Sequence, residues 1–213
     1  MSKKTAIFLN GGAGRMISSI PAVEKYLEEN PEKDPILVCE GGTDAFKGHP
    51  KLYFKAYDSW HKNLFQELLK DRELISPEPY RIWEYYNQKC SLAQAYDIAI
   101  NNKGIRDLPK PTIRLSKEEL LMARKLSKKY GVMMMSEFPL EFKKHMSSPV
   151  ATPMNVHIRI WMAVIKQANH FVGCDSVGQH IAYAFNGTST VLIGSTYPVS
   201  TSFPDSDNVD IID

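Results

Sequence analysis

Residues 170–198 decide the predicted fold of this chain, and they read HFVGCDSVGQHIAYAFNGTSTVLIGSTYP. The stretch opens with an apolar run that ends at Asp175 and Ser176, two residue types that can cap a helix. A helix with an apolar face follows, Asn186 and Gly187 end it, and residues 190–193 form a second buried strand. In a parallel sheet, both polar turns would lie at the carboxyl ends of strands, where ligands bind. The helix N-terminus there would offer free N–H groups and a positive dipole end, so the sequence predicts a phosphate site.

The rest of the chain continues this alternation of strands and helices, which predicts an α/β protein with mainly parallel sheets. Ser116 and Glu119 have the spacing of a capping box at the start of a helix. Residues 102–111 contain Gly104, Pro109 and Pro111, which is typical of a linker, so we expect two domains, 1–108 and 109–213. The expected strands are 5–9, 35–40, 52–57, 97–101, 132–136, 170–174 and 190–193, and the expected helices are 17–29, 62–70, 80–95, 116–130, 156–167 and 176–185.

The composition is that of an ordinary soluble globular protein. Of the 213 residues, 43% are hydrophobic and 23% are charged, and the formal net charge is +2. This charge is too small to indicate a nucleic-acid partner, and no apolar run approaches the roughly 20 residues of a transmembrane helix. The N-terminus lacks an apolar signal-peptide segment, so we expect a cytoplasmic location. Cys39, Cys90 and Cys174 each lie in or beside an apolar segment, which predicts reduced and buried thiols.

Two motifs resemble the signature of glycosyltransferase family 9, the ADP-heptose:lipopolysaccharide heptosyltransferase family. The family motif is Asp-Ser/Thr-Gly-x-x-His-Leu-Ala-Ala-Ala, followed by a strand that ends in Phe-Gly-Pro-Thr-x-Pro. This chain has Asp-Ser-Val-Gly-Gln-His-Ile-Ala-Tyr-Ala at 175–184 and Ile-Gly-Ser-Thr-Tyr-Pro at 193–198. Family members also open with a strand, a Gly-rich turn and a helix that carries Pro-Ala-Val. This chain has Gly-Gly-Ala-Gly at 11–14 and Pro-Ala-Val at 21–23, so the resemblance covers about residues 5–45 and 155–200.

The resemblance implies the GT-B architecture, in which two small Rossmann-like lobes enclose a cleft. The acceptor would bind the 1–108 lobe and the donor the 109–213 lobe, which looks abridged because its usual Lys-bearing opening loop has no counterpart. The implied reaction is inverting, metal-independent sugar transfer, without a cofactor, from a nucleotide-diphosphate sugar resembling ADP-heptose to a saccharide or glycolipid acceptor. The implied donor-binding residues are Asp175, Ser176, Val177, Gly178, His180, Gly194, Ser195 and Thr196, and Gly11, Gly12 and Gly14 would line the acceptor side.

Position 15 departs from the family pattern. The family places a catalytic Asp directly after the last glycine of the first turn, whereas this chain has Arg15. A guanidinium stays protonated and cannot act as a general base, although it can hold a phosphate or an anionic acceptor. Glu40 and Asp44 are candidates for a replacement base, and loop capping is the alternative role for both. The predicted catalytic residues are therefore Arg15, Glu40 and Asp44.

Two other functions stay open on the sequence alone. The missing Asp and the short second lobe favour a non-catalytic, nucleotide-sugar-binding remnant of the family. An NAD-type dinucleotide-binding module is the second alternative, because Gly12-x-Gly14 follows a strand and Glu40 ends the next one, although Ile17 replaces the third glycine. The sequence contains no Gly-x-Ser-x-Gly elbow, no Gly-Lys-Ser/Thr phosphate loop, no CxxC pair and no helical pair of His ligands, so we expect no metal.

Overall fold

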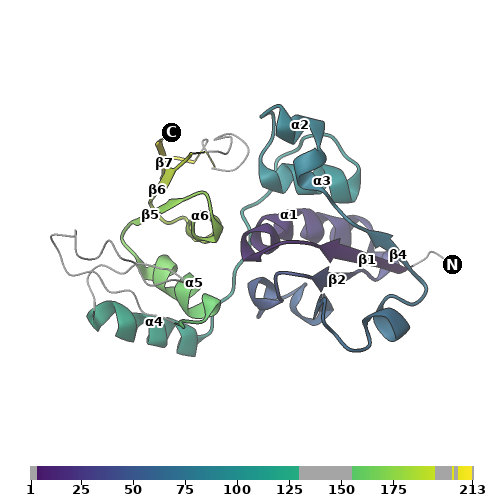
Figure 1. Cartoon of the computed structure of the whole chain (residues 1–213), viewed down its shortest axis with the longest axis horizontal. Coiled ribbons are helices and arrows are strands. Elements are labelled where there is room, and N and C mark those ends of the chain that lie inside the picture. The colour runs from purple at the N-terminus through teal and green to yellow at the C-terminus, as the bar shows by residue number, and fades with distance from the viewer. Residues whose placement is uncertain (1–3, 130–154, 195–202, 204–205, 213) are drawn as a thin grey trace.

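The computed structural model describes residues 4–129, 155–194, 203 and 206–212, which form two α/β lobes (Figure 1). The sheet of the N-terminal lobe has the strand order β3-β2-β1-β4, and that of the C-terminal lobe has the order β5-β6-β7. Every described strand pair is parallel, which confirms the predicted fold class. The strands are β1 (Lys4–Leu9), β2 (Ile36–Cys39), β3 (Ala56–Asp58), β4 (Arg72–Ile75), β5 (Phe171–Cys174), β6 (Ser189–Leu192) and β7 (Val209–Ile212).

The α-helices of the described residues are α1 (Ala13–Glu29), α2 (Trp83–Tyr86), α3 (Leu92–Asn101), α4 (Lys117–Lys129), α5 (Ile158–Gln167) and α6 (Val177–Ala184). Helix α1 connects β1 to β2 and helix α6 connects β5 to β6, as expected for parallel strands. Short 3₁₀ helices lie at Pro31–Lys33, Asp44–Phe46, Tyr53–Lys55 and Pro79–Arg81, and a π-helical turn lies at Leu64–Leu68.

Helix α1 places the first glycine turn at the centre of the molecule. Its apolar residues recur at helical spacing, and Met16, Ile17, Ile20 and Val23 are completely buried. This face packs against β1 and α3 and fixes the direction in which the N-terminus of α1 points. The helix ends at Asn30, whose backbone N–H donates to the Tyr26 carbonyl oxygen at 2.9 Å.

The two lobes share one hydrophobic core, which fixes their relative position. Ile17 of α1 belongs to the same buried cluster as Met162 of α5 and Ile181 of α6. A polar contact adds to this packing, because Arg159 of α5 donates to the backbone oxygen of Asp44 in the N-terminal lobe at 3.0 Å. Residues from both lobes can therefore form one site at the junction.

The segment 80–101 differs from the sequence prediction. The predicted helix 80–95 is interrupted between α2 and α3, and the predicted strand 97–101 is wrong because these residues form the second half of α3. Helix α3 begins with a capping box. The Ser91 hydroxyl accepts from the Gln94 backbone N–H at 3.3 Å, and the Gln94 side-chain oxygen accepts from the Ser91 backbone N–H at 2.9 Å. Leu92, Tyr96 and Ile100 then recur at helical spacing and supply a buried face.

Several shorter elements also differ. The predicted helix 62–70 is only the π-helical turn, and the predicted strand 52–57 is a 3₁₀ turn that leads into β3. Strands β4 and β7 were not predicted at all. The helix that starts after Ser116 is confirmed together with its capping box to Glu119, whose two bonds measure 2.7 and 3.2 Å. The predicted strand 132–136 lies outside the described residues.

The three cysteines have two different environments. Cys39 and Cys90 are buried as predicted, and burial raises the pKa of the Cys39 thiol to about 12 and that of Cys90 to about 11. Both thiols are therefore protonated near neutral pH. Cys174 is exposed, so the prediction of a buried thiol is wrong there, because its side chain lies on the outer face of β5.

Candidate functional site

The glycine turn between β1 and α1 is closely packed against the end of β2. Gly11 has a φ of +80°, which favours glycine. A Cβ added to Gly41 would overlap the backbone oxygen of Gly11, so only glycine allows the two turns to approach this closely. The backbone N–H of Gly11 donates to the Glu40 carboxylate at 2.6 Å. The predicted residues Gly11, Gly12 and Glu40 therefore lie together at the carboxyl edge of the sheet.

Arg15 lies inside a network of side chains on the other side of this turn. Its guanidinium donates to the side-chain oxygen of Asn10 and lies 4.3 Å from the ring centroid of Tyr80. The Asn10 amide nitrogen in turn donates to Glu78 at 2.5 Å. Sequence reasoning missed Asn10, Glu78 and Tyr80. The last two follow β4, so recognising that strand would have been the signal for them.

The turn before α6 carries the strongest predicted donor residue. Asp175 directly follows β5 and accepts a hydrogen bond from the side-chain amide of Gln179, one turn into the helix. Ser176 occupies the N-cap position with extended backbone, but among the described residues its hydroxyl makes no capping hydrogen bond. The predicted start of the helix is confirmed, but its cap is not made by the Ser176 hydroxyl. The N-terminus of α6 instead leaves its first N–H groups without that cap.

Gly178 and Val177, next to this turn, pack against other side chains. A Cβ on Gly178 would overlap the ring of Phe171, so this glycine allows α6 to lie closely on β5. Val177 is partly buried against the shared core. Gly194 lies exposed just after β6, and Ser195 and Thr196 lie outside the described residues. The structure thus gives Gly178 a packing role that the sequence did not reveal.

His180 lies at the contact between the two lobes. It is 5% exposed, and its Nδ1 lies 3.2 Å from the hydroxyl oxygen of Ser18 on α1. A Cβ added to Gly14 would lie only 3.1 Å from the His180 ring, so the small residue lets α1 and α6 approach. Burial lowers the pKa of His180 to about 4, although the nearby Asp175 opposes this shift. His180 is thus neutral near pH 7 and joins the lobes.

The charges of Arg15 and Asp175, which come from different lobes, both affect the pKa of Tyr85. Burial raises the pKa of Tyr85, the negative charge of Asp175 raises it further, and the positive charge of Arg15 opposes the rise. The rings of Tyr80 and Tyr85 meet edge to face with centroids 5.2 Å apart. The Tyr80–Tyr85 pair therefore extends the network that begins at Glu78, Asn10 and Arg15.

Asp44 has different neighbours from the other predicted catalytic residues. Its carboxylate lies 3.5 Å from His157, and its backbone oxygen accepts from Arg159. These contacts are with the start of α5, whereas Arg15 and Glu40 contact the first glycine turn. Within the described contacts, the structure brings Arg15 and Glu40 to the turn and does not bring Asp44 there.

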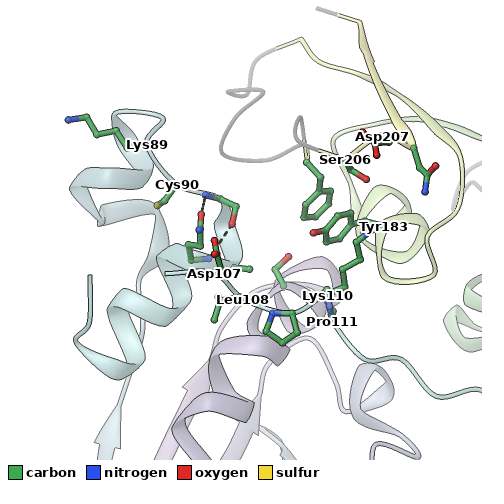
Figure 2. A pocket seen from close by; sticks show the side chains of 16 residues that line it. Lys89, Cys90, Asp107, Leu108, Lys110, Pro111, Tyr183, Ser206 and Asp207 are labelled. Atoms are coloured by element: carbon green, nitrogen blue, oxygen red, sulfur yellow. Dashed lines mark hydrogen bonds between the residues drawn. The ribbon is translucent and has the colours of Figure 1, made fainter. Parts of the chain in front are cut away.

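A cavity of about 400 Å³ lies beside the contact between the lobes, which is a ligand-sized volume. Lys89, Cys90 and Asp107 lie on one side of it, and Tyr183, Ser206 and Asp207 lie on the other (Figure 2). Ser18 lines it too and links it to His180. Sequence reasoning predicted none of these lining residues. They come from α1, the start of α3, the 107–111 linker, α6 and the segment before β7, which only the fold brings together.

Two expected absences concern the described residues only. Among them, no group of three or more His, Cys, Asp or Glu side chains is arranged to hold a metal ion. No helix within the described part of the chain is long and apolar enough to cross a membrane. The expected cytoplasmic location stays a prediction.

Comparison with known proteins gives similarity in structure but not in sequence. No family model and no curated protein matches the chain. A glycosyltransferase family 9 structure from Veillonella parvula superposes with a TM-score of 0.69 at 10% identity, over 99% of this chain and 86% of the other. The Escherichia coli ADP-heptose lipopolysaccharide heptosyltransferase II gives 0.64 at 11% identity, over 98% and 90%.

The glycosyltransferase TibC from enterotoxigenic E. coli gives a TM-score of 0.61 at 13% identity, over 98% of this chain and 65% of its own. At identities this low, the superpositions show similarity of fold alone. In all three structures this similarity extends over nearly the whole of this chain. The lobes, their parallel sheets and the two motif turns agree with the resemblance seen in the sequence. The chain therefore has the fold of the glycosyltransferase family 9 heptosyltransferases.

Proposed function

We propose that this protein binds a nucleotide-diphosphate sugar between its lobes and transfers the sugar to a saccharide or glycolipid acceptor. One observation carries the proposal: the first glycine turn of one lobe packs against the start of α6 in the other, because a Cβ on Gly14 would lie 3.1 Å from His180, which itself lies 3.2 Å from Ser18. One of the similar structures holds ADP-D-β-D-heptose, so ADP-heptose is the first donor to test. The ligand-sized cavity beside the contact between the lobes could hold part of a substrate.

The N-terminus of α6 would bind the diphosphate. Helix N-termini attract phosphate through their free N–H groups and dipole, and Ser176 and Gly178 place little side-chain bulk there. Asp175 would accept hydrogen bonds from sugar hydroxyls. His180 would support the turn from the buried side instead of touching the donor, since Ser18 occupies its Nδ1. Ser195 and Thr196 stay predicted donor contacts.

The acceptor would approach from the side of the first glycine turn. Of the two predicted replacement bases, Glu40 contacts this turn and Asp44 contacts His157 and Arg159. Arg15 cannot take a proton, but its fixed guanidinium can bind an anionic group of the donor or the acceptor. The same position supports the second candidate function, a binder of nucleotide sugars without catalysis, because the expected catalytic carboxylate is absent there.

Asp175→Ala tests the donor site. Loss of a hydrogen bond from a charged side chain costs about 1.5–3 kcal/mol, so calorimetric affinity for ADP-heptose should fall by about 10-fold or more. Asp210→Ala is the matched control, because Asp210 is an exposed carboxylate on β7. Equal affinity in the parent and Asp175→Ala, with native circular dichroism in both, would remove Asp175 from the site.

Turnover separates the two candidate functions. The parent enzyme is mixed with ADP-heptose and lipopolysaccharide, and the release of ADP is followed. Binding with ADP release supports transfer, and binding without release supports the non-catalytic binder. Binding of NAD in place of all ADP- and UDP-sugars would contradict both and favour the dinucleotide-binding module.

A further inference from the structure

Two carboxylates, not one, flank the end of β1. Glu40 follows β2 and Glu78 follows β4, and the sheet order places β1 between these two strands. Glu40 accepts from the Gly11 backbone at 2.6 Å, and Glu78 accepts from the Asn10 side chain at 2.5 Å. Either carboxylate could replace the missing base after the glycine turn, so the choice depends on their surroundings.

Glu78 is held more firmly than Glu40. The Asn10 side chain uses its oxygen to accept from Arg15 and its nitrogen to donate to Glu78, so the orientation of its amide is defined at both ends. Arg15 is in turn fixed over the Tyr80 ring. Glu78 is half-buried, whereas Glu40 is exposed to solvent. A carboxylate that is fixed and partly withdrawn from water needs less reorganisation during proton transfer.

The side chains that hold Arg15 come from the segment after β4, as Glu78 does. Tyr80 lies against Arg15, and Tyr85 meets Tyr80 edge to face. This chain of contacts lies on the β4 side of β1, which is the side of Glu78. Glu40 lies on the opposite side, at the end of β2.

The buried hydroxyl of Tyr96 lies near the Asn10–Arg15–Glu78 network. Tyr96 is completely buried and, among the described residues, its hydroxyl has no hydrogen-bond partner. Tyr96 lies on α3, which packs against α1 and against the Pro79–Arg81 turn next to Glu78. A buried polar group without a partner costs about 1–3 kcal/mol, and such groups are found at sites that a ligand or an ordered water completes.

We infer that Glu78 is the general base of the proposed glycosyl transfer, and that Asn10 and Arg15 position it. The inference rests on the proposed function. The acceptor hydroxyl gives its proton to the Glu78 carboxylate while its oxygen forms a bond to the anomeric carbon of the donor sugar. The bond from that carbon to the diphosphate oxygen breaks, and its electron pair leaves with the nucleotide diphosphate. A base from β4 thus replaces the one that the family places after β1.

Glu78→Gln tests the assignment in the full-length protein. The Gln side chain keeps an oxygen that can accept from Asn10, but it cannot take a proton. With ADP-heptose as donor and lipopolysaccharide as acceptor, kcat should fall by about 10²–10⁴-fold while KM for ADP-heptose stays unchanged. The rising limb of the pH–rate profile, which reports the base, should disappear. Glu73→Gln is the matched control, because Glu73 is an exposed carboxylate on β4 that pairs with Lys33.

Glu78→Ala supplies a test that a purely structural role cannot pass. Added formate should restore ADP release in this variant, since a small carboxylate can fill the space left by the side chain, and it should not accelerate the parent. A Glu78→Gln variant with the parental rate, a loss of activity in Glu40→Gln alone, or no rescue by formate would overturn the assignment and leave the proposed function standing. A parent that binds ADP-heptose but releases no ADP would overturn transfer itself, and the assignment of Glu78 with it.

Discussion

Acidification should destabilise this protein through His180, the buried residue that joins the two lobes. Its pKa is about 4 in the folded protein, against an ordinary value of 6.5. Above pH 6.5 the ring is neutral in both the folded and the unfolded state, so stability is complete there. Below that pH, His180 binds a proton in the unfolded chain but stays neutral in the folded protein. The free energy of unfolding therefore falls until the pH reaches about 4. Each pKa unit is worth about 1.4 kcal/mol, so the full loss is about 3 kcal/mol.

Most of this loss should occur in a pH range where the protein is easily studied. Between about pH 7 and about pH 5, His180 alone should lower the free energy of unfolding by about 2 kcal/mol. With an ordinary denaturant slope of about 2 kcal/mol per molar urea, the unfolding midpoint should move down by about 1 M. Asp175 lies near His180 and opposes the shift, so Asp175→Asn should enlarge the loss.

Urea unfolding of the parent and of His180→Gln at both pH values isolates this contribution. Gln does not titrate and can still hydrogen-bond to Ser18, so the other titrating groups cancel in the comparison. His61→Gln is the control, because His61 is exposed and should leave the parental pH dependence unchanged. Equal pH dependence in the parent and His180→Gln would refute the reasoning. So would an NMR titration in which the His180 ring protonates near pH 6.5.

Two further changes test the packing that builds the site. Gly41→Ala should destabilise the protein by about 1–3 kcal/mol in chemical denaturation because its Cβ overlaps the Gly11 carbonyl, whereas Gly12→Ala meets no atom within 4 Å and should cost less. A parental midpoint in Gly41→Ala would show that the two turns are not in contact. Arg159→Met should cost about 3–5 kcal/mol, because Glu119 loses a buried partner at 2.9 Å, and adding Glu119→Leu should restore much of the loss. A double variant no more stable than Arg159→Met would contradict a buried ion pair.

The sequence was sufficient where the structural signal is local. The 170–194 segment folds as predicted, since each strand is an apolar run and the helix between them has a clear apolar face. Strands β4 and β7 could not be predicted in the same way. Each has four residues, and β4 lies at the sheet edge with Glu73 and Leu74 exposed, so its sequence carries no burial pattern. The 80–101 segment was misassigned because the capping box at Ser91 was not recognised as a new helix start.

The same distinction explains which site residues the sequence revealed. Motif comparison found Arg15 and Asp175 because each sits at a fixed distance from a glycine turn. It placed His180 against the donor, since nothing in the sequence around it shows that Ser18, 162 residues away, occupies its ring nitrogen.

Glu78 illustrates the limit most clearly. It lies 63 positions after Arg15, and only the pairing of β1 with β4 brings it to Asn10. A position-by-position comparison with the family finds no carboxylate at position 15 and predicts an enzyme without a general base. The register between β1 and β4 instead supplies a carboxylate at the same edge of the sheet, and the arginine that replaced the family residue helps to hold it. The base that we propose thus comes from a neighbouring strand end, which a comparison of single motif positions cannot reveal.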